Sequence, residues 1–154
     1  MDESIKESSL NYINRLVGKK LQYAIKSPDT ELYDLGFGKL INATNLHGHK
    51  KMVGEYAIHV LCNIRVIWQT ERRKVHDYYG NTSQEAFNSR IRRLLGMEVL
   101  RVGLSEKNDL YLDLGCCWIV FVTLENNAES WRFFSSNREM PHLVASDAWL
   151  EMVY

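Results

Sequence analysis

The sequence predicts an α+β fold in which a helix–β-hairpin–strand unit occurs twice, forming antiparallel sheet with two covering helices. The first observation is a repeat at a constant spacing of 78 residues, since Ile13–Gly18 returns as Ile91–Gly96. The second is that helix-start and helix-stop residues flank each of these segments. The third is that β-branched and aromatic runs follow each segment. We expect the two units to pack about a pseudo-two-fold axis.

The repeat continues beyond the helices at the same spacing of 78 residues. One extra residue in the second copy then shifts the spacing, so Asp34-Leu35-Gly36 corresponds to Asp113-Leu114-Gly115. We expect repeat units at about 4–68 and 82–154, joined by a linker at about 69–81, within a single domain of residues 1–154. The intervening matches are Leu21 with Val99, Ser27 with Ser105, Leu32 with Leu110, and Tyr33 with Tyr111.

Each expected helix has a start signal and a stop signal. Ser4-x-x-Glu7 and Thr82-x-x-Glu85 have the pattern of a capping box, in which Ser4 or Thr82 caps the helix. Gly18 and Gly96 are expected to end the helices in a left-handed conformation. Both helices have one apolar face that a sheet must cover. These faces consist of Leu10, Ile13, Leu16 and Val17 in the first helix, and of Phe87, Ile91, Leu94 and Leu95 in the second.

Strands are expected where β-branched and aromatic residues are dense or alternate with polar ones. The alternating run 56–68 forms one strand, or two strands if Asn63 marks a bulge. Residues 42–54 and 69–81 are polar or charged, and we expect them to be loops. The expected strands are residues 21–25, 32–35, 56–68, 98–104, 110–114, 117–124, 131–134, 143–145 and 149–153.

Composition and charge limit the classes of function. The chain has 154 residues, and its 19 basic and 19 acidic side chains cancel, which argues against a surface that binds polyanions over the whole protein. Three cysteines, two of them adjacent, do not make a disulfide framework, and this favours a reducing cytoplasm. The chain start lacks the features of a signal peptide, and no apolar run is long enough to span a membrane.

Residues 56–66, Tyr-Ala-Ile-His-Val-Leu-Cys-Asn-Ile-Arg-Val, resemble a motif of a family of small, uncharacterised bacterial proteins. The resemblance implies a bacterial cytoplasmic protein, and it transfers no site residues because the family has no known activity. By analogy with small proteins of similar build, it also suggests an immunity or accessory role. Further stretches that fit this family are Asp77–Tyr79, Asp109–Leu112, Trp131–Phe134 and Pro141–Val144.

Two residues of the run 56–68, His59 and Arg65, share its less apolar face and are the first candidates for a polar site. Arg132 and His142 join them if the two copies are adjacent. The alternative is structural, with Arg65 and Arg132 pairing with acidic residues such as Asp34 and Asp113.

Other reactive side chains have simpler explanations. His47-Gly48-His49 resembles a metal site, but four ligands are needed, and His76 and Asp77 could complete it only if the fold brought the loops together. Cys62 belongs to an apolar set, and an aspartate before Leu-Gly is ordinary turn chemistry. The sequence therefore predicts no catalytic residue, no metal ligand and no cofactor.

The function that the sequence favours is non-catalytic binding of another protein, with exposed Tyr78, Tyr79 and Tyr154 as anchors. A small-molecule or metal-dependent enzyme with a site at the junction of the copies is the alternative. The third reading is nucleic-acid binding through the basic and aromatic region Arg72–Arg93, although a solvated helix face also explains these charges. A membrane partner is not expected, and homodimerisation is left open.

Overall fold

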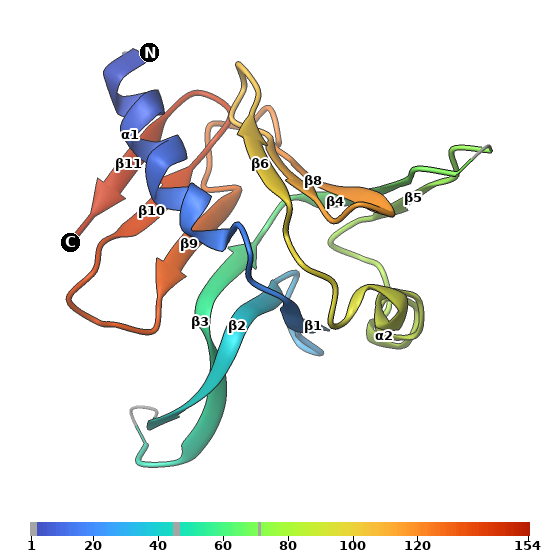
Figure 1. Ribbon diagram of the computed structural model, residues 1–154, viewed down its shortest axis with the longest axis horizontal. Helices are drawn as coiled ribbons and strands as arrows, with labels where there is room; N and C mark the ends of the chain where they lie inside the picture. Colours follow the sequence, from blue (N-terminus) through green and yellow to red (C-terminus); the bar gives the residue numbers. More distant parts are fainter. Residues whose placement is uncertain (1–2, 45–46, 71) are drawn as a thin grey trace.

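The computed structural model describes residues 3–44, 47–70 and 72–154, and it is an α+β fold with two helices and two antiparallel sheets (Figure 1). The helices are α1 (Glu3–Ile13) and α2 (Gln84–Ile91), and each continues into a 3-10 turn, Asn14–Leu16 or Arg92–Leu94. The six-stranded sheet has the order β1 (Leu21–Lys26), β2 (Tyr33–Thr44), β3 (Lys50–Val60), β9 (Trp131–Ser135), β10 (His142–Ala145) and β11 (Leu150–Val153). The five-stranded sheet has the order β5 (Val75–Tyr78), β4 (Asn63–Trp68), β8 (Cys117–Val122), β7 (Leu110–Asp113) and β6 (Arg101–Leu104).

The helix starts differ from the expected capping boxes. Ser4 lies inside α1, so it does not precede the helix. Ser83 caps α2, because its side chain accepts a hydrogen bond of 3.1 Å from the Ala86 amide. Thr82, the expected cap, instead accepts a hydrogen bond of 2.8 Å from the Tyr79 amide. The prediction placed the helix cap one residue too early. Thr82 and Ser83 both have a hydroxyl that can cap a helix, but the Thr82 hydroxyl is used in the preceding turn.

The helix ends lead into one junction. Gly18 and Gly96 have φ values of +87° and +86°, which confirms the expected left-handed glycines. The Gly18 amide donates to the Val99 carbonyl (2.8 Å), and the Gly96 amide donates to the Leu21 carbonyl (2.7 Å). The Leu21 and Val99 amides each donate at 2.9 Å, to the carbonyls of Met97 and Lys19 respectively. We call residues 18–21 and 96–99, joined by these four bonds, the glycine junction.

Both sheets contain strands from both halves of the chain. The chain leaves the six-stranded sheet after Val60 and enters the five-stranded sheet at Asn63, and it crosses in the other direction between β8 and β9. Consequently β3 pairs with β9, and β4 pairs with β8. The Leu61 amide donates to the Ser130 carbonyl (2.7 Å), so the two crossings are held together. β5 lies within the segment 69–81 that we expected to be a linker.

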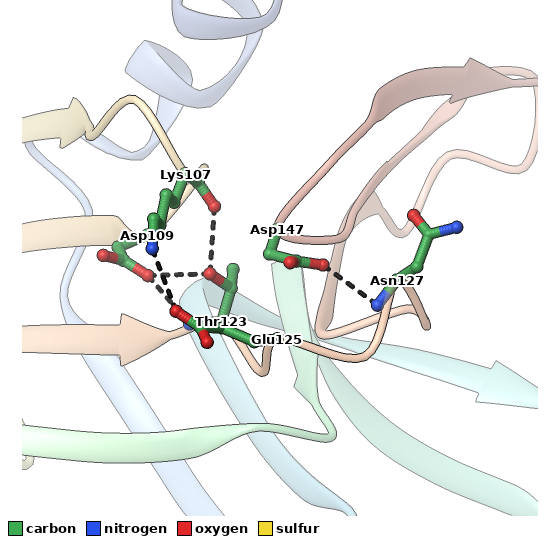
Figure 2. A network of polar contacts seen from close by, with 6 residues as sticks. All are labelled: Lys107, Asp109, Thr123, Glu125, Asn127 and Asp147. Carbon is green, nitrogen blue, oxygen red and sulfur yellow. Dashed lines mark hydrogen bonds and ion pairs between the residues drawn. The ribbon is translucent and has the colours of Figure 1, made fainter.

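A polar network anchors the crossing between β8 and β9 (Figure 2). The Thr123 amide donates to Asp109 Oδ1 (2.8 Å), and the Lys107 ammonium donates to Glu125 (2.9 Å). The Asn127 amide donates to Asp147 (3.1 Å), which follows β10. The crossing is therefore tied to the β6–β7 turn at one end and to the β10–β11 turn at the other (Figure 2).

The helices pack against the inner faces of the sheets. In α1, Tyr12 contacts Phe133 of β9 edge to face, with ring centroids 5.0 Å apart. In α2, Phe87 contacts Tyr33 of β2 (4.6 Å) and Tyr78 of β5 (5.1 Å) in the same manner. These inward-facing side chains belong to one hydrophobic core that both sheets share. The outward-facing side chains of the two sheets form the surfaces considered below.

The long hairpin of β2 and β3 bends back over the outer face of its sheet. The pairing register shifts between Phe37 and Leu40, and Gly38 has a φ of +79°. Asp34 of β2 lies opposite His59 of β3. If β3 were straight, Lys51 would lie roughly 26 Å from His59 and thus far from Asp34. Lys51 Nζ is nevertheless 4.0 Å from the Asp34 carboxylate. The hairpin therefore curves sharply at the bulge.

The expected loop at 42–54 is wrong for most of the described residues, because residues 42–44 belong to β2 and residues 50–54 to β3. This part of the hairpin is largely exposed, so its polar composition resembles that of a loop. Cross-strand pairing rather than burial makes it a strand. No helix in the described ranges is long and apolar enough to cross a membrane.

We predict that Gly54→Ala destabilises the fold by about 1–3 kcal/mol, the usual cost of an added methyl group in a tightly packed site. A Cβ at this position would lie 2.7 Å from the backbone nitrogen and oxygen of Phe37, which cannot move without breaking the bend. Gly103→Ala is the matched control, since among the described residues no heavy atom other than those of Gly103 and its chain neighbours lies within 4 Å of the added carbon. Urea denaturation of both variants measures the difference, and equal stabilities would contradict the prediction.

Candidate functional site

Cross-strand pairing assembles a polar cluster on the outer face of the six-stranded sheet. Asp34 of β2 lies opposite His59 of β3, and His59 lies opposite Arg132 of β9. Phe134 is two residues after Arg132 and therefore faces the same side. His142 on β10 joins them through contacts with Phe134 and Arg132. We call the set Asp34, His59, Glu129, Arg132, Phe134 and His142 the histidine cleft.

Phe134 lies between the two imidazoles. Its ring contacts His59 edge to face, with centroids 4.7 Å apart and an interplanar angle of 85°. It stacks on His142 at the same distance with an angle of 17°. Such contacts fix ring orientations, so both imidazoles have defined positions.

Arg132 connects the cleft to an acidic residue. One terminal nitrogen donates to Glu129 (2.8 Å), and the other lies 3.1 Å from His142 Nδ1. Because an arginine only donates, Nδ1 must accept, and the proton of the neutral imidazole is on Nε2. Burial, the Arg132 charge and His59 lower the pKa of His142 below 6.5, and Glu129 opposes them. His142 is thus held in its neutral form.

Asp34 is less well satisfied than Arg132. Its Oδ1 lies 3.5 Å from His59 Nε2, which is longer than an ordinary hydrogen bond. Among the described residues this buried oxygen has no hydrogen-bond partner. Its other oxygen is 4.0 Å from the Lys51 ammonium. A buried acceptor without a partner is costly, so this carboxylate is available to a hydrogen-bond donor.

Two hollows meet at His59 and Phe134. The larger, of about 820 Å³, extends over the cleft, and the smaller, of about 210 Å³, lies beneath the bent hairpin. The larger hollow is lined by Leu32, His59, Glu129, Arg132, Phe134, Arg138 and His142. The smaller is lined by Tyr23, Asp34, Lys51, Val53, Gly54, Ala57, His59, Phe134 and Ser136.

The structure brings together three of the residues that the sequence proposed, His59, Arg132 and His142. Arg65 is not among them, because the chain changes sheet between Val60 and Asn63. It lies in β4 and pairs with Asp77 at 2.7 Å. The expectation that Arg65 and Arg132 form ion pairs was correct, but their partners are Asp77 and Glu129 rather than Asp34 and Asp113.

The tyrosines differ in exposure. Tyr78 was expected to be exposed, but only 2% of it is accessible because it packs on Phe87 in the core. Tyr79 and Tyr154 are exposed, to 48% and 95%. Alternation along β5 explains the difference, since Asp77 and Tyr79 flank Tyr78 and project away from the core.

A second surface, which sequence analysis missed, covers the outer face of the five-stranded sheet. Trp118 of β8 lies opposite Ile67 of β4 and Asp113 of β7. The guanidinium of Arg101 lies 5.3 Å from the centre of the Trp118 ring, and Tyr111 contacts that ring edge to face. Ion pairs border the surface on both sides. We call the set Arg65, Ile67, Val75, Arg101, Tyr111, Trp118 and Val120 the tryptophan face.

The missed signal lies in residues 117–122, Cys-Trp-Ile-Val-Phe-Val, where every side chain is apolar. Such a run is typical of a strand buried on both sides. In the structure, Ile119 and Phe121 point into the core, whereas Trp118 is partly exposed.

Part of the basic region Arg72–Arg93 lies beside Trp68, the last residue of β4. Arg73 lines a hollow of about 490 Å³ together with Trp68 and Trp118. Arg90 and Arg93 line a second hollow of about 230 Å³ on Trp68. Positive charge therefore gathers beside Trp68, which a nucleic-acid-binding surface would require.

Metal and cysteine chemistry has little geometric support. Within the described ranges, no three His, Cys, Asp or Glu side chains are grouped closely enough to hold a metal ion. The rings of His47 and His49 lie 6.5 Å apart. Burial raises the pKa of Cys62 to about 12, and burial also raises that of Cys117, so both are held as thiols.

No family model, curated protein or solved structure matches this chain.

We predict that Arg132→Gln raises the pKa of His142 toward 6.5, because it removes a neighbouring positive charge. In the wild type, the lowered pKa of His142 stabilises the folded state. This stabilisation is fully present at pH values above the ordinary histidine pKa of 6.5. It is lost as the pH falls through the lowered value. Titration of the His142 Cε1 proton by NMR measures both proteins, with Arg65→Gln on the other sheet as control. An unchanged pKa in Arg132→Gln would show that Arg132 does not hold His142 neutral.

Proposed function

We propose that the chain is a non-catalytic binding protein whose partner is another protein, and that the tryptophan face contacts this partner. The observation that carries the proposal is the grouping of Trp118 in the central strand β8 with Tyr111 and Arg101 from the next two strands, β7 and β6, on an open sheet face. Tryptophan, tyrosine and arginine are the residue types that contribute most to binding energy at protein interfaces. Ile67 and Val75, the latter 48% exposed, extend the apolar centre.

The charges around this face favour an acidic partner. Arg65 and Arg101 are each paired with an aspartate of the chain itself, so they form a neutral polar rim. Arg73 adds positive charge at the edge of this face, where it lines a hollow with Trp68 and Trp118. A partner with an apolar centre and carboxylates on one side complements both features.

The resemblance of residues 56–66 to small bacterial proteins supports a bacterial and cytoplasmic setting for this binding. Cysteines that are free rather than bridged agree with a reducing compartment. If the partner is a toxin, the chain is an immunity protein.

We also infer that the chain arose by internal duplication and that a pseudo-two-fold axis relates its halves. The glycine junction supports this, because a shift of 78 residues converts the bond from Gly18 to Val99 into the bond from Gly96 to Leu21. The strand orders β1-β2-β3 and β6-β7-β8 agree, and each is extended by the last strands of the other half. Trp118 then corresponds to His59, each opposite the matching aspartate, so the two outer faces have diverged in chemistry.

We predict that a tagged wild-type chain retains one stoichiometric protein from native cytoplasm and that Trp118→Ala weakens this binding at least about 30-fold, the loss expected for an interface hot spot. Phe134→Ala is the matched control, since it removes a partly exposed aromatic ring from the other sheet. Mass spectrometry identifies the protein, and calorimetry with the purified pair measures the affinity.

The same experiment separates the alternatives. Recovery of only a second copy of the chain would replace the proposal with a homodimer. Recovery of RNA or DNA, lost at high salt and in a variant with Arg72, Arg73 and Lys74 changed to alanine, would favour nucleic-acid binding instead. A partner that survives Trp118→Ala but is lost in Phe134→Ala would move the interface to the other sheet.

A further inference from the structure

We propose that the histidine cleft binds a small organic oxyanion, with its carboxylate or phosphate group held by Arg132, Arg138 and the imidazoles and its body against Phe134. This site goes beyond the proposed protein partner, since it lies on the other sheet. The site lies at the junction of the two halves, because His59 comes from the first half and Arg132 and His142 come from the second. It is therefore a specific version of the small-molecule site that the sequence left as an alternative.

The polar groups that line the larger hollow are mostly hydrogen-bond donors. Arg132 and Arg138 are permanently positive and only donate. His142, neutral and with its Nδ1 occupied by Arg132, has its proton on Nε2 and is a donor there. Glu129 is the carboxylate of this lining, and it is already paired with Arg132. A ligand that complements this lining must supply acceptors, and an oxyanion does so with the matching charge.

Arg132 is held in place before any ligand binds. Its two terminal nitrogens contact Glu129 and His142, which restrains the planar guanidinium on both sides. A guanidinium has five N–H groups, so these contacts leave donors for a ligand. Because the side chain is already ordered, binding loses less conformational entropy than it would at a free arginine.

The hollow also provides an apolar wall and sufficient room. Phe134 presents a ring that is flanked by imidazoles, and Leu32 lies at the margin. A volume of about 820 Å³ is in the range of sites for small organic molecules. An inorganic anion would fill little of this space, so the ligand is expected to have a ring or other apolar body.

The same charges disfavour a metal ion. The positive charge of Arg132 lowers the pKa of His142, and it would repel a bound cation for the same reason. His142 Nδ1 is also engaged by Arg132 and is not free to coordinate. The larger hollow, whose lining does not include Asp34, is therefore better suited to an anion than to a cation.

The test is an NMR titration of the histidine Cε1 protons of the full chain with phenyl phosphate, benzoate and inorganic phosphate. The His59 and His142 signals are assigned with His59→Gln and His142→Gln. We expect phenyl phosphate, benzoate or both to shift these two signals saturably and to bind at least about tenfold more tightly than inorganic phosphate. The comparison of the two organic probes identifies phosphate or carboxylate as the preferred group.

Three variants accompany the titration. Arg132→Gln should weaken binding at least about tenfold. Arg65→Gln, which removes another ion-paired strand arginine on the opposite sheet, should leave binding unchanged. Phe134→Leu keeps the charges and should weaken the organic probes but not inorganic phosphate, so the proposal can be tested even if Arg132→Gln unfolds. The proposal is overturned if no probe saturates these signals below about 10 mM, or if Arg132→Gln and Phe134→Leu both bind like the wild type.

Discussion

The arrangement of the molecule depends on the four backbone hydrogen bonds of the glycine junction. Each contributes a net stabilisation of about 0.5–1.5 kcal/mol, and both segments of the junction begin at a glycine with positive φ. Another residue at Gly18 or Gly96 would add about 1–2 kcal/mol of backbone strain. Because the two turns bond to one another, each helix ends beside the start of the other half's hairpin. This explains why α1 packs against β6 and α2 against β1.

Interlocking of the halves determines where function can reside. His59 of β3 meets Arg132 of β9, and Ile67 of β4 meets Trp118 of β8, so each outer face combines residues from both halves. Neither the histidine cleft nor the tryptophan face would exist in half of the chain alone. The two faces differ in chemistry, since one gathers two imidazoles and two arginines around Phe134 and a hollow, whereas the other is an open face with Trp118 on its central strand. One chain thus has two outer surfaces of different chemistry.

The elements that depend on local chemistry were predictable from the sequence. The positive φ of Gly18 and Gly96 and most strands follow from glycine placement and side-chain alternation. What sequence patterns could not reveal is the change of sheet after Val60. Alternation continues through residues 56–68 even though the strand partners change, so Arg65 was grouped with His59. Residues 42–44 and 50–54 of the bent hairpin were wrongly expected to be a loop for the converse reason, because pairing rather than an apolar face makes them strands.

The central claim is that the glycine junction joins two interlocked halves into one cooperative unit. Native-state hydrogen exchange tests it most directly, because the amides of Gly18, Leu21, Gly96 and Val99 donate the four bonds. We predict that all four exchange with the same free energy and the same denaturant dependence as global unfolding. The claim would be contradicted if two of these amides exchanged through a local opening of lower free energy while the amides of both sheets stayed protected.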